Sequence, residues 1–232
     1  MPSKRYKKAL ALVPEKASTL KAAAELIGQF PKTKFDETLD LAFRLGVDPR
    51  QSDQMVRGTV PLPHGSGKLV KVLVFAKPGP AAEAAKAAGA EFVGFEDMIK
   101  QCNDGWTGFD VAVATPEAMV EVRKLGKVLG PRGLMPNPKT GTVTEDTAKA
   151  VKEVKAGRVE FKVDKTGNVH VVVGKASFKP DQIEENARAV IDAIVKARPS
   201  SVKGTFIRSV TLSATMSPGI DLDLRALNTA GA

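Results

Sequence analysis

Cysteine, histidine and aromatic residues are all scarce in this chain of 232 residues, and each shortage excludes a class of protein. The single cysteine, Cys102, has no partner for an internal disulfide and rules out a cysteine-rich zinc site. The two histidines, His64 and His170, lie far apart without metal-ligating company, so we expect structural roles and no bound metal. Aromatic residues make up 5 % of the chain, too few for a wide platform that stacks single-stranded bases.

Long apolar runs are also missing. No run approaches the length needed to span a membrane, and the basic N-terminal stretch MPSKRYKKALALVP lacks the apolar core of a signal peptide. We therefore expect a cytoplasmic protein without a membrane partner. Hydrophobic residues still make up 43 % of the chain, which is enough for packed cores.

Enzymatic motifs fail as well. The GSGK stretch at residues 65–68 is similar to the end of a phosphate-binding loop. However, the required earlier glycine is absent, Leu69 stands in place of Ser or Thr, and the stretch precedes a predicted strand instead of following one. The glycines of residues 126–133 lack dinucleotide-binding spacing. No cofactor is therefore expected.

Apolar periodicity predicts the order of helices and strands. Helices are expected over residues 4–12, 19–29, 80–88, 96–102, 116–125, 144–155 and 180–198, and strands over 35–45, 55–62, 69–76, 91–93, 109–114, 159–163, 169–173 and 206–215. Thr144 is the expected cap of its helix, and residues 159–163 and 169–173 are expected to pair as a hairpin. Strands near both ends alternate with period two, which indicates an antiparallel sheet with helices. The middle strands are nearly all apolar and alternate with helices, which indicates a small parallel sheet covered on both faces.

This pattern predicts one domain interrupted by another. Residues 1–65 and 158–232 would form an α+β outer domain, and residues 66–157 an inserted three-layer α/β domain. Glycines at both crossings predict a hinge. The insert holds 13 basic and 11 acidic side chains, a net charge of +2, and the outer domain holds 22 and 15, a net charge of +7. The outer domain is therefore favoured as the main surface for nucleic acid.

The most unusual stretch is residues 125–143, LGKVLGPRGLMPNPKTGTV. Its glycines and prolines exclude a regular helix or a central strand. Apolar side chains would anchor it to a scaffold, while Lys127, Arg132 and Lys139 make it basic. A long loop of this kind is usually functional in a compact domain. Two interpretations stay open: a structural cap over the inserted sheet, or a contact with nucleic acid.

This stretch resembles the hallmark of the large-subunit ribosomal protein L-one family, bacterial type, which belongs to the mobile ribosomal stalk beside the tRNA exit site. Other similar stretches are KFDETLDLAFRLGVDPRQSDQMVRGTV, the pair DKTGNVH and GKASF, and KGTF, RSV and TLSATM near the end. The resemblance covers nearly the whole chain. It implies a hinged two-domain RNA-binding protein that is not an enzyme. The implied partners are large-subunit rRNA, exit-site tRNA and the mRNA of its own operon, which it would repress; no obligate homo-oligomer is expected.

The resemblance also assigns an rRNA surface. Its positions are Glu25, Lys34, Phe35, Asp36, Thr38, Asp164, Lys165, Thr166, Gly167, Ser209, Thr215, Met216, Ser217 and Gly219. Cationic, aromatic and hydroxyl groups at strand ends suit contacts with phosphate and sugar. On the residues alone, a core position for Phe35 and a plain turn at residues 164–167 are the favoured interpretations, and only the resemblance reverses them. A contact of residues 125–143 with tRNA is likewise implied only by the resemblance.

Two rival functions remain on the residues alone. The inserted domain could be an α/β enzyme for a small phosphorylated ligand, since such sheets often bind ligands beyond their strand ends. The chain could also be a nonspecific basic binder, which competition with unrelated RNA would reveal.

Overall fold

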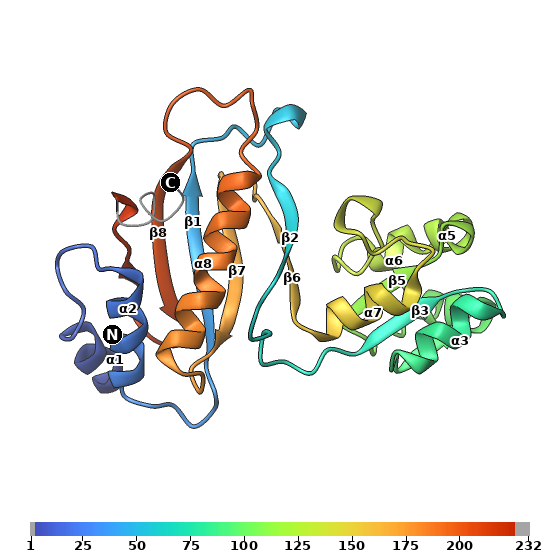
Figure 1. Cartoon of the computed structure of the whole chain (residues 1–232), viewed down its shortest axis with the longest axis horizontal. Helices are drawn as coiled ribbons and strands as arrows, with labels where there is room; N and C mark the ends of the chain where they lie inside the picture. Colours follow the sequence, from blue (N-terminus) through green and yellow to red (C-terminus); the bar gives the residue numbers. More distant parts are fainter. Residues whose placement is uncertain (1–2, 226–232) are drawn as a thin grey trace. The chain divides into compact units, whose positions relative to one another are not determined.

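The computed structural model describes residues 3–225 and divides into two compact units (Figure 1). One unit joins the described chain up to Gly67 with the chain from Val159 onward, and the other is Lys68–Arg158. Each unit has its own sheet and its own hydrophobic core.

The first unit is built on a four-stranded antiparallel sheet with the order β7-β1-β8-β9. Its strands are β1 (Thr38–Leu45), β7 (Asn168–Lys175), β8 (Ile207–Ala214) and β9 (Ile220–Asp221). Alternation along β1 buries Leu39, Leu41 and Phe43 and turns the residues between them to the other face. The predicted antiparallel sheet with one buried face is confirmed. β1 begins three residues later than predicted, at Thr38, because residues 35–37 form a loop.

Two helices pack against the buried face of this sheet and against each other. They are α2 (Leu20–Gln29) and α8 (Pro180–Lys196), and a third helix, α1 (Lys4–Leu10), precedes them in the chain. The hydroxyl of Thr19 accepts a hydrogen bond from the Ala22 amide and so caps α2. The apolar spacing of α8 puts Val195 on the same stripe as Ile191 and Ile194, but Val195 is 46 % exposed. Asn186, which was not predicted to be buried, lies in the core instead.

The predicted hairpin between residues 159–163 and 169–173 is wrong. β6 (Arg158–Lys162) pairs with β2 (Arg57–Pro61) in a separate two-stranded ribbon, while β7 pairs with β1. The turn at residues 164–167 leads the chain from one sheet to the other, and the Leu45 amide at the end of β1 donates to the Gly167 carbonyl at 2.9 Å. A short 3₁₀ helix, η1 (Ser52–Gln54), connects β1 to β2.

The second unit is built on a parallel sheet with the order β4-β3-β5. Its strands are β3 (Val72–Phe75), β4 (Phe92–Gly94) and β5 (Val111–Ala114), and its main helices are α3 (Pro80–Ala87), α4 (Glu96–Asn103), α5 (Pro116–Val122) and α7 (Thr147–Lys155). Leu73 and Phe75 pack with Cys102 in one core, whereas Val72 and Val74 pack in the other. Both faces of the sheet are therefore covered, as the apolar run predicted.

Residues 125–143 are more regular than predicted. A 3₁₀ turn, η2 (Arg123–Leu125), leads into one turn of helix, α6 (Gly126–Leu129), and a second 3₁₀ turn, η3 (Pro138–Thr140), follows. The glycines did not prevent helical turns because Leu125 and Leu129 anchor the segment in the core, so packing outweighs the weak helix propensity of glycine.

Two further expectations in this unit are corrected. Leu69 is not part of the strand that was predicted from residue 69; it is 97 % exposed, and β3 begins at Val72. α7 is capped by Asp146 and not by Thr144, because the Asp146 carboxylate accepts a hydrogen bond from the Lys149 amide at 3.0 Å.

Candidate nucleic-acid interface

One face of the four-stranded sheet in the first unit is open. α2 and α8 cover the opposite face, which Figure 1 shows with α8 lying in front of the strands. The open face carries side chains that are half-buried or exposed: Asp40, Ala42, Arg44, His170, Val172, Ser209, Thr211 and Ser213. Hydroxyl, imidazole and guanidinium groups of this kind contact phosphate and sugar in protein complexes with nucleic acid.

Three loops meet at one end of the open face, where β1 begins and β7 and β8 end. The pairing of Thr38 with Lys175 and of Leu39 with Ala214 brings residues 31–37, 176–178 and 215–219 together. Lys34 is exposed there, and Phe35 and Met216 are each 53 % exposed. The interpretation of Phe35 as a core residue is therefore wrong. We call this group the strand-end cluster.

Hydrogen bonds between backbone and hydroxyl groups fix the strand-end cluster. The Thr38 amide donates to Thr215 Oγ1 at 3.1 Å, and the Thr215 amide donates to the Thr38 carbonyl at 3.0 Å. Lys175 Nζ donates to Thr38 Oγ1 at 2.8 Å. The Asp36 carboxylate accepts from both the amide and the hydroxyl of Ser177. Asp36 and Thr215 therefore shape the loops, whereas Lys34, Phe35 and Met216 face outward.

A hollow of about 340 Å³ lies beside the strand-end cluster. Phe35, Asp36, Ser177 and Ser217 line it together with Gly28, which is near the end of α2. Glu25 is exposed on α2, one helical turn before Gly28. Ser217 and Gly219 complete the turn after β8, and a side chain at Gly219 would collide with Thr211.

A tight turn of residues 164–167 occupies the other end of the open face. Asp164 Oδ1 accepts from the amides of Thr166 and Asn168, both at 2.8 Å, and the Thr166 hydroxyl donates to Asp164 Oδ2 at 2.7 Å. These bonds, first the one from the Asn168 amide, lower the pKa of Asp164 below its ordinary value. Gly167 has a φ of 84°, which a side chain would strain. The turn holds Lys165 exposed beside the end of β1.

Apart from Glu25, which is on α2, the site residues expected from sequence lie on the open face or in the loops at its two ends. Arg44 pairs with Asn168 at one end of β1, and Thr38 pairs with Lys175 at the other. Eight strand residues at about 3.3 Å each separate the two ends by roughly 25 Å. Ser209 lies directly opposite Arg44, at the same end of the sheet as the turn of residues 164–167. Sequence reasoning missed Arg44, although the period-two pattern of β1 places it on the same face as Thr38.

The segment 125–143 of the second unit is a structural cap on its inner side. Leu125 and Leu129 are buried, and Leu134 and Met135 pack against the same core. The outer side carries Lys127 and Arg132, which are exposed; the Arg132 guanidinium donates to the Thr107 hydroxyl. The side chain of Lys139 lies outside the described part of the structure. The packing thus supports the cap interpretation, while Lys127 and Arg132 stay exposed.

Within residues 3–225, no group of three or more His, Cys, Asp and Glu side chains could hold a metal ion. None of the described helices is long and apolar enough to cross a bilayer. Cys102 is buried, and burial raises the pKa of its thiol, so it is a core residue and not a reactive one.

An open sheet face with cations and hydroxyl groups at both ends, joined to a unit whose parallel sheet is covered on both faces, is the arrangement expected of a protein that contacts nucleic-acid backbone. Comparison with known proteins identifies the family. The model of the Ribosomal protein L1p/L10e family matches residues 22–218. The chain therefore belongs to the Ribosomal protein L1p/L10e family, as the resemblance implied, and it is not an enzyme.

Individual relatives match over nearly their whole length. The chain is 55 % identical over 226 residues to the large ribosomal subunit protein uL1 of Clavibacter michiganensis subsp. michiganensis, covering 97 % of this chain and 99 % of the relative. It is 57 % identical over 212 residues to the protein of the same name from Clavibacter sepedonicus, covering 91 % and 92 %. It is 54 % identical over 222 residues to that of Kosmotoga olearia, covering 95 % and 96 %.

Proposed function

We propose that this chain is a constituent of the large subunit of the cytoplasmic ribosome and binds large-subunit rRNA through the open face of its first unit. The observation that carries the proposal is an uncovered sheet face that bears Ser209, with the exposed Lys34 and Lys165 in the loops at its opposite ends. A face of roughly 25 Å can meet several successive phosphates of a folded RNA. The names of the three relatives, all large ribosomal subunit proteins, support the same assignment.

Within this proposal the fourteen predicted site residues have two kinds of role. Lys34 and Lys165 meet phosphate, while Phe35, Met216 and the hydroxyl of Ser209 contact sugar and base edges. Those whose polar atoms bond within the protein, such as Asp36 and Asp164, hold the loops in the shape that the RNA meets.

The second unit is proposed to be an inserted domain, residues 66–157, that moves with the ribosomal stalk and assists the release of exit-site tRNA. The exposed Lys127 and Arg132 on the outer side of the cap support this role. Residues 125–143 contain no Asp or Glu, so their charge is wholly positive. Exit-site tRNA would be attracted to this side of the unit.

The open face is also proposed to bind the mRNA of the protein's own operon and repress its translation. Since one surface would serve both RNAs, the mRNA would be bound only when free protein exceeds the available rRNA. Competition between a large-subunit rRNA transcript and the operon leader transcript tests this point. Simultaneous binding of both transcripts to one protein would reject it.

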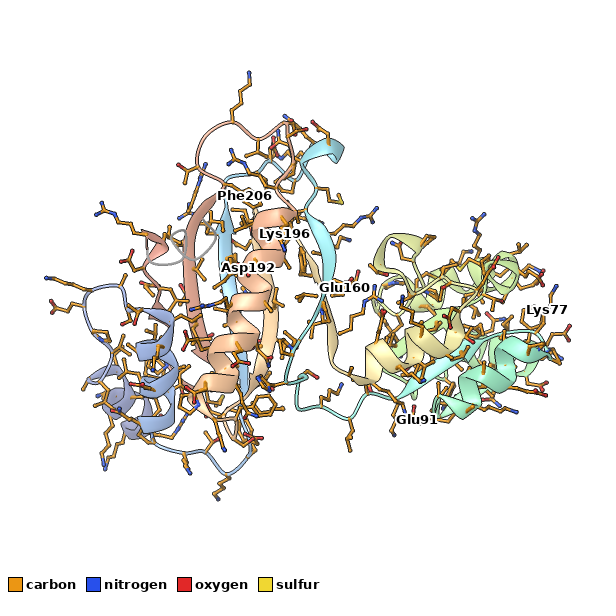
Figure 2. The ribbon with its side chains drawn as sticks, viewed as in Figure 1. Lys77, Glu91, Glu160, Asp192, Lys196 and Phe206 are labelled. Atoms are coloured by element: carbon orange, nitrogen blue, oxygen red, sulfur yellow. The ribbon has the colours of Figure 1, made fainter. Side chains whose placement is uncertain are left out.

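The primary proposal is tested by titrating the protein with a large-subunit rRNA transcript at several salt concentrations. Lys34→Ala and Lys165→Ala should each lower the salt slope of the binding constant by about one, because each lysine neutralises one phosphate. Lys196→Ala is the matched control. Lys196 is exposed on α8, which covers the other face of the sheet (Figure 2), and its loss should leave the slope unchanged.

Specificity is decided in the same titration. Unrelated folded RNA should compete poorly at near-physiological salt, because a nonspecific complex depends on charge alone. Equal competition by unrelated RNA would identify a nonspecific basic binder. A loss of slope for Lys196→Ala equal to that for Lys34→Ala would remove the open face as the binding surface.

A further inference from the structure

Arg5 joins three separate segments of the first unit at the strand-end cluster. Its side chain comes from α1, and its guanidinium donates to the carbonyl of Met216 at 2.5 Å and to that of Pro31 at 3.4 Å. It also pairs with the Glu37 carboxylate at 3.3 Å. The planar guanidinium has several donors in a fixed fork, which suits it to hold several acceptors at once.

Glu37 is the buried centre of this arrangement. Its side chain is only 7 % exposed, whereas that of Arg5 is 25 % exposed. The second carboxylate oxygen accepts from the Ser217 hydroxyl at 3.1 Å, and the Glu37 carbonyl accepts from the Ala176 amide at 2.8 Å. Through these bonds Glu37 contacts the turns after β7 and β8, and Arg5 adds α1. We call these contacts the Arg5–Glu37 latch.

The Arg5 guanidinium is therefore paired with a carboxylate and two carbonyl groups of the protein itself. A buried carboxylate is costly unless it is paired, and removing one partner leaves the other charge uncompensated. Here the uncompensated charge would be negative and would lie beneath Met216 and Ser217, in the cluster proposed to meet phosphate. Lys34 differs from Arg5 in this respect, because it is exposed at the surface of the same cluster.

From this we infer that Arg5 is a positioning residue that shapes the RNA-binding loops through Glu37 and does not itself neutralise a phosphate. The inference rests on the proposed function and adds α1 to the binding device. None of the predicted site residues lies on α1. The role of Arg5 could not be read from the sequence, because its partner Glu37 is 32 residues away and the pair leaves no local pattern.

The first test compares Arg5→Met and Arg5→Lys with Lys34→Ala in rRNA titrations over a range of salt. Arg5→Met should weaken binding by about tenfold with a salt slope that changes by much less than one, because a loosened site loses affinity without losing a phosphate contact. Arg5→Lys should recover part of the loss, because it keeps a charge beside Glu37. A slope that falls by about one for Arg5→Met, or binding within about twofold of the native protein, would overturn the inference.

The second test is a double-mutant cycle with Glu37→Gln. Removing both charges takes away the uncompensated carboxylate, so Arg5→Met should weaken binding much less in the Glu37→Gln background than in the native one. Additive losses would show that Arg5 and Glu37 act independently and would overturn the latch. Thermal unfolding of each variant verifies that the protein is folded at the temperature of the titration.

The third test needs no RNA and separates failure of the latch from failure of the proposed function. In the free protein, Arg5→Met should speed amide hydrogen exchange at Ala176 and Ser217, whose bonds lie in the latched turns, and leave Val113 of the second unit unchanged. Unchanged exchange at Ala176 and Ser217 overturns the latch. If no version of the protein binds rRNA, the proposed function fails, and the exchange result still decides whether the latch holds the turns.

Discussion

The sheets of the two units differ in how many of their faces are buried. β1 of the first unit alternates between buried and more exposed side chains, whereas all four residues of β3 in the second unit are buried. The antiparallel sheet is covered on one face only, and the parallel sheet is packed on both. A sheet with an open face offers a broad polar surface on a rigid support. A sheet covered on both faces can offer polar groups only at its strand ends and in its loops.

This difference explains where each unit carries its cations. In the first unit Arg44 stands on a strand within the sheet ladder, and Lys165 lies in a turn that is hydrogen-bonded to the end of the same strand. In the second unit the exposed Lys127 and Arg132 lie on a capping segment that hydrophobic anchors hold in place. Binding groups on strands are positioned more precisely than those on loops. The first unit is therefore the better candidate for a permanent RNA contact and the second for a transient one.

The largest expected effects test whether the two cores are energetically separate. Phe43→Ala in the first unit and Phe75→Ala in the second each remove a fully buried ring, and each should cost about 3–5 kcal/mol of unfolding free energy. Because each ring packs within its own unit, each variant should destabilise that unit alone. Amide hydrogen exchange at Val210 and Val113 would report on the two sheets. Equal loss of protection at both amides, in either variant, would show one cooperative unit.

A somewhat smaller effect is expected from Asn186→Ala. The Asn186 amide group donates to the carbonyls of Val173 at 2.8 Å and Gly65 at 3.0 Å, and its carbonyl oxygen accepts from the His64 amide at 3.0 Å. Truncation leaves these backbone groups without a partner, so we expect a loss of about 2–4 kcal/mol in the first unit.

Asp192→Ala is the control for that experiment. Asp192 is exposed on the same helix (Figure 2), and its replacement should change stability by less than about 0.5 kcal/mol. Chemical denaturation followed by a probe in the first unit measures both variants. A cost for Asn186→Ala no larger than that for Asp192→Ala would mean that water replaces the lost hydrogen bonds.

Most of the fold could be predicted from the sequence, because local periodicity sets it. The buried face of α2 and the alternation of β1 follow directly from the spacing of apolar residues. Pairing between distant strands could not be predicted in this way. β6 comes just before a turn that is typical of a hairpin, yet it pairs with β2 and not with β7, and only tertiary packing decides between the two partners. The same holds for Leu69, which belongs to an apolar run but lies outside the sheet.

The candidate site divides along the same line. Lys34, Phe35 and Lys165 could be singled out because a strand end or a turn is visible in the sequence and matches a known family. The residues that hold these loops were invisible, since Arg5 and Lys175 reach their partners across distant parts of the chain. Asn186 was hidden for a similar reason: its polar side chain satisfies backbone groups of two other segments.

Replacing Asp by Asn should change the unfolding free energy in opposite directions in the two units, and the larger change is expected at Asp110. Its carboxylate accepts hydrogen bonds from Lys68 Nζ at 2.5 Å and from the Lys71 amide at 3.0 Å. The bond from Lys68 is the larger cause and the bond from the Lys71 amide the second, and together they lower the pKa of Asp110. A carboxylate with a lowered pKa in the fold stabilises the protein above its unfolded pKa, and this stability is lost as pH falls through the folded pKa. Asp110→Asn should therefore destabilise the second unit at pH 7 by less than about 1 kcal/mol, the small size reflecting solvent screening. Urea titrations at pH 7 and pH 3 measure the difference, which should shrink at the lower pH.

The smallest effect is expected at Asp40 on the open face, where the sign reverses. Burial beside β7 and β8 is the first cause that raises the pKa of Asp40, and it outweighs the opposing influence of His170 and Lys175. A carboxylate with a raised pKa in the fold destabilises the protein when it is charged and contributes nothing once it is protonated in both states. Asp40→Asn should therefore stabilise the first unit at pH 7 by a few tenths of a kcal/mol, about the size of a surface substitution. The gain should fade as pH falls through the raised pKa of Asp40 in the folded protein, and it should be gone below the ordinary value of 3.8.

The same two variants also test whether Asp40 affects RNA binding. If the open face meets RNA, removing this negative charge should also strengthen rRNA binding at low salt, so Asp40 would limit affinity as well as stability. Asp110→Asn provides the matched control, since it removes the same charge from the second unit and should not strengthen rRNA binding by that route. Equal gains in affinity for both variants would mean that net charge alone governs binding. In that case the open face of the first unit would have no special role in RNA recognition.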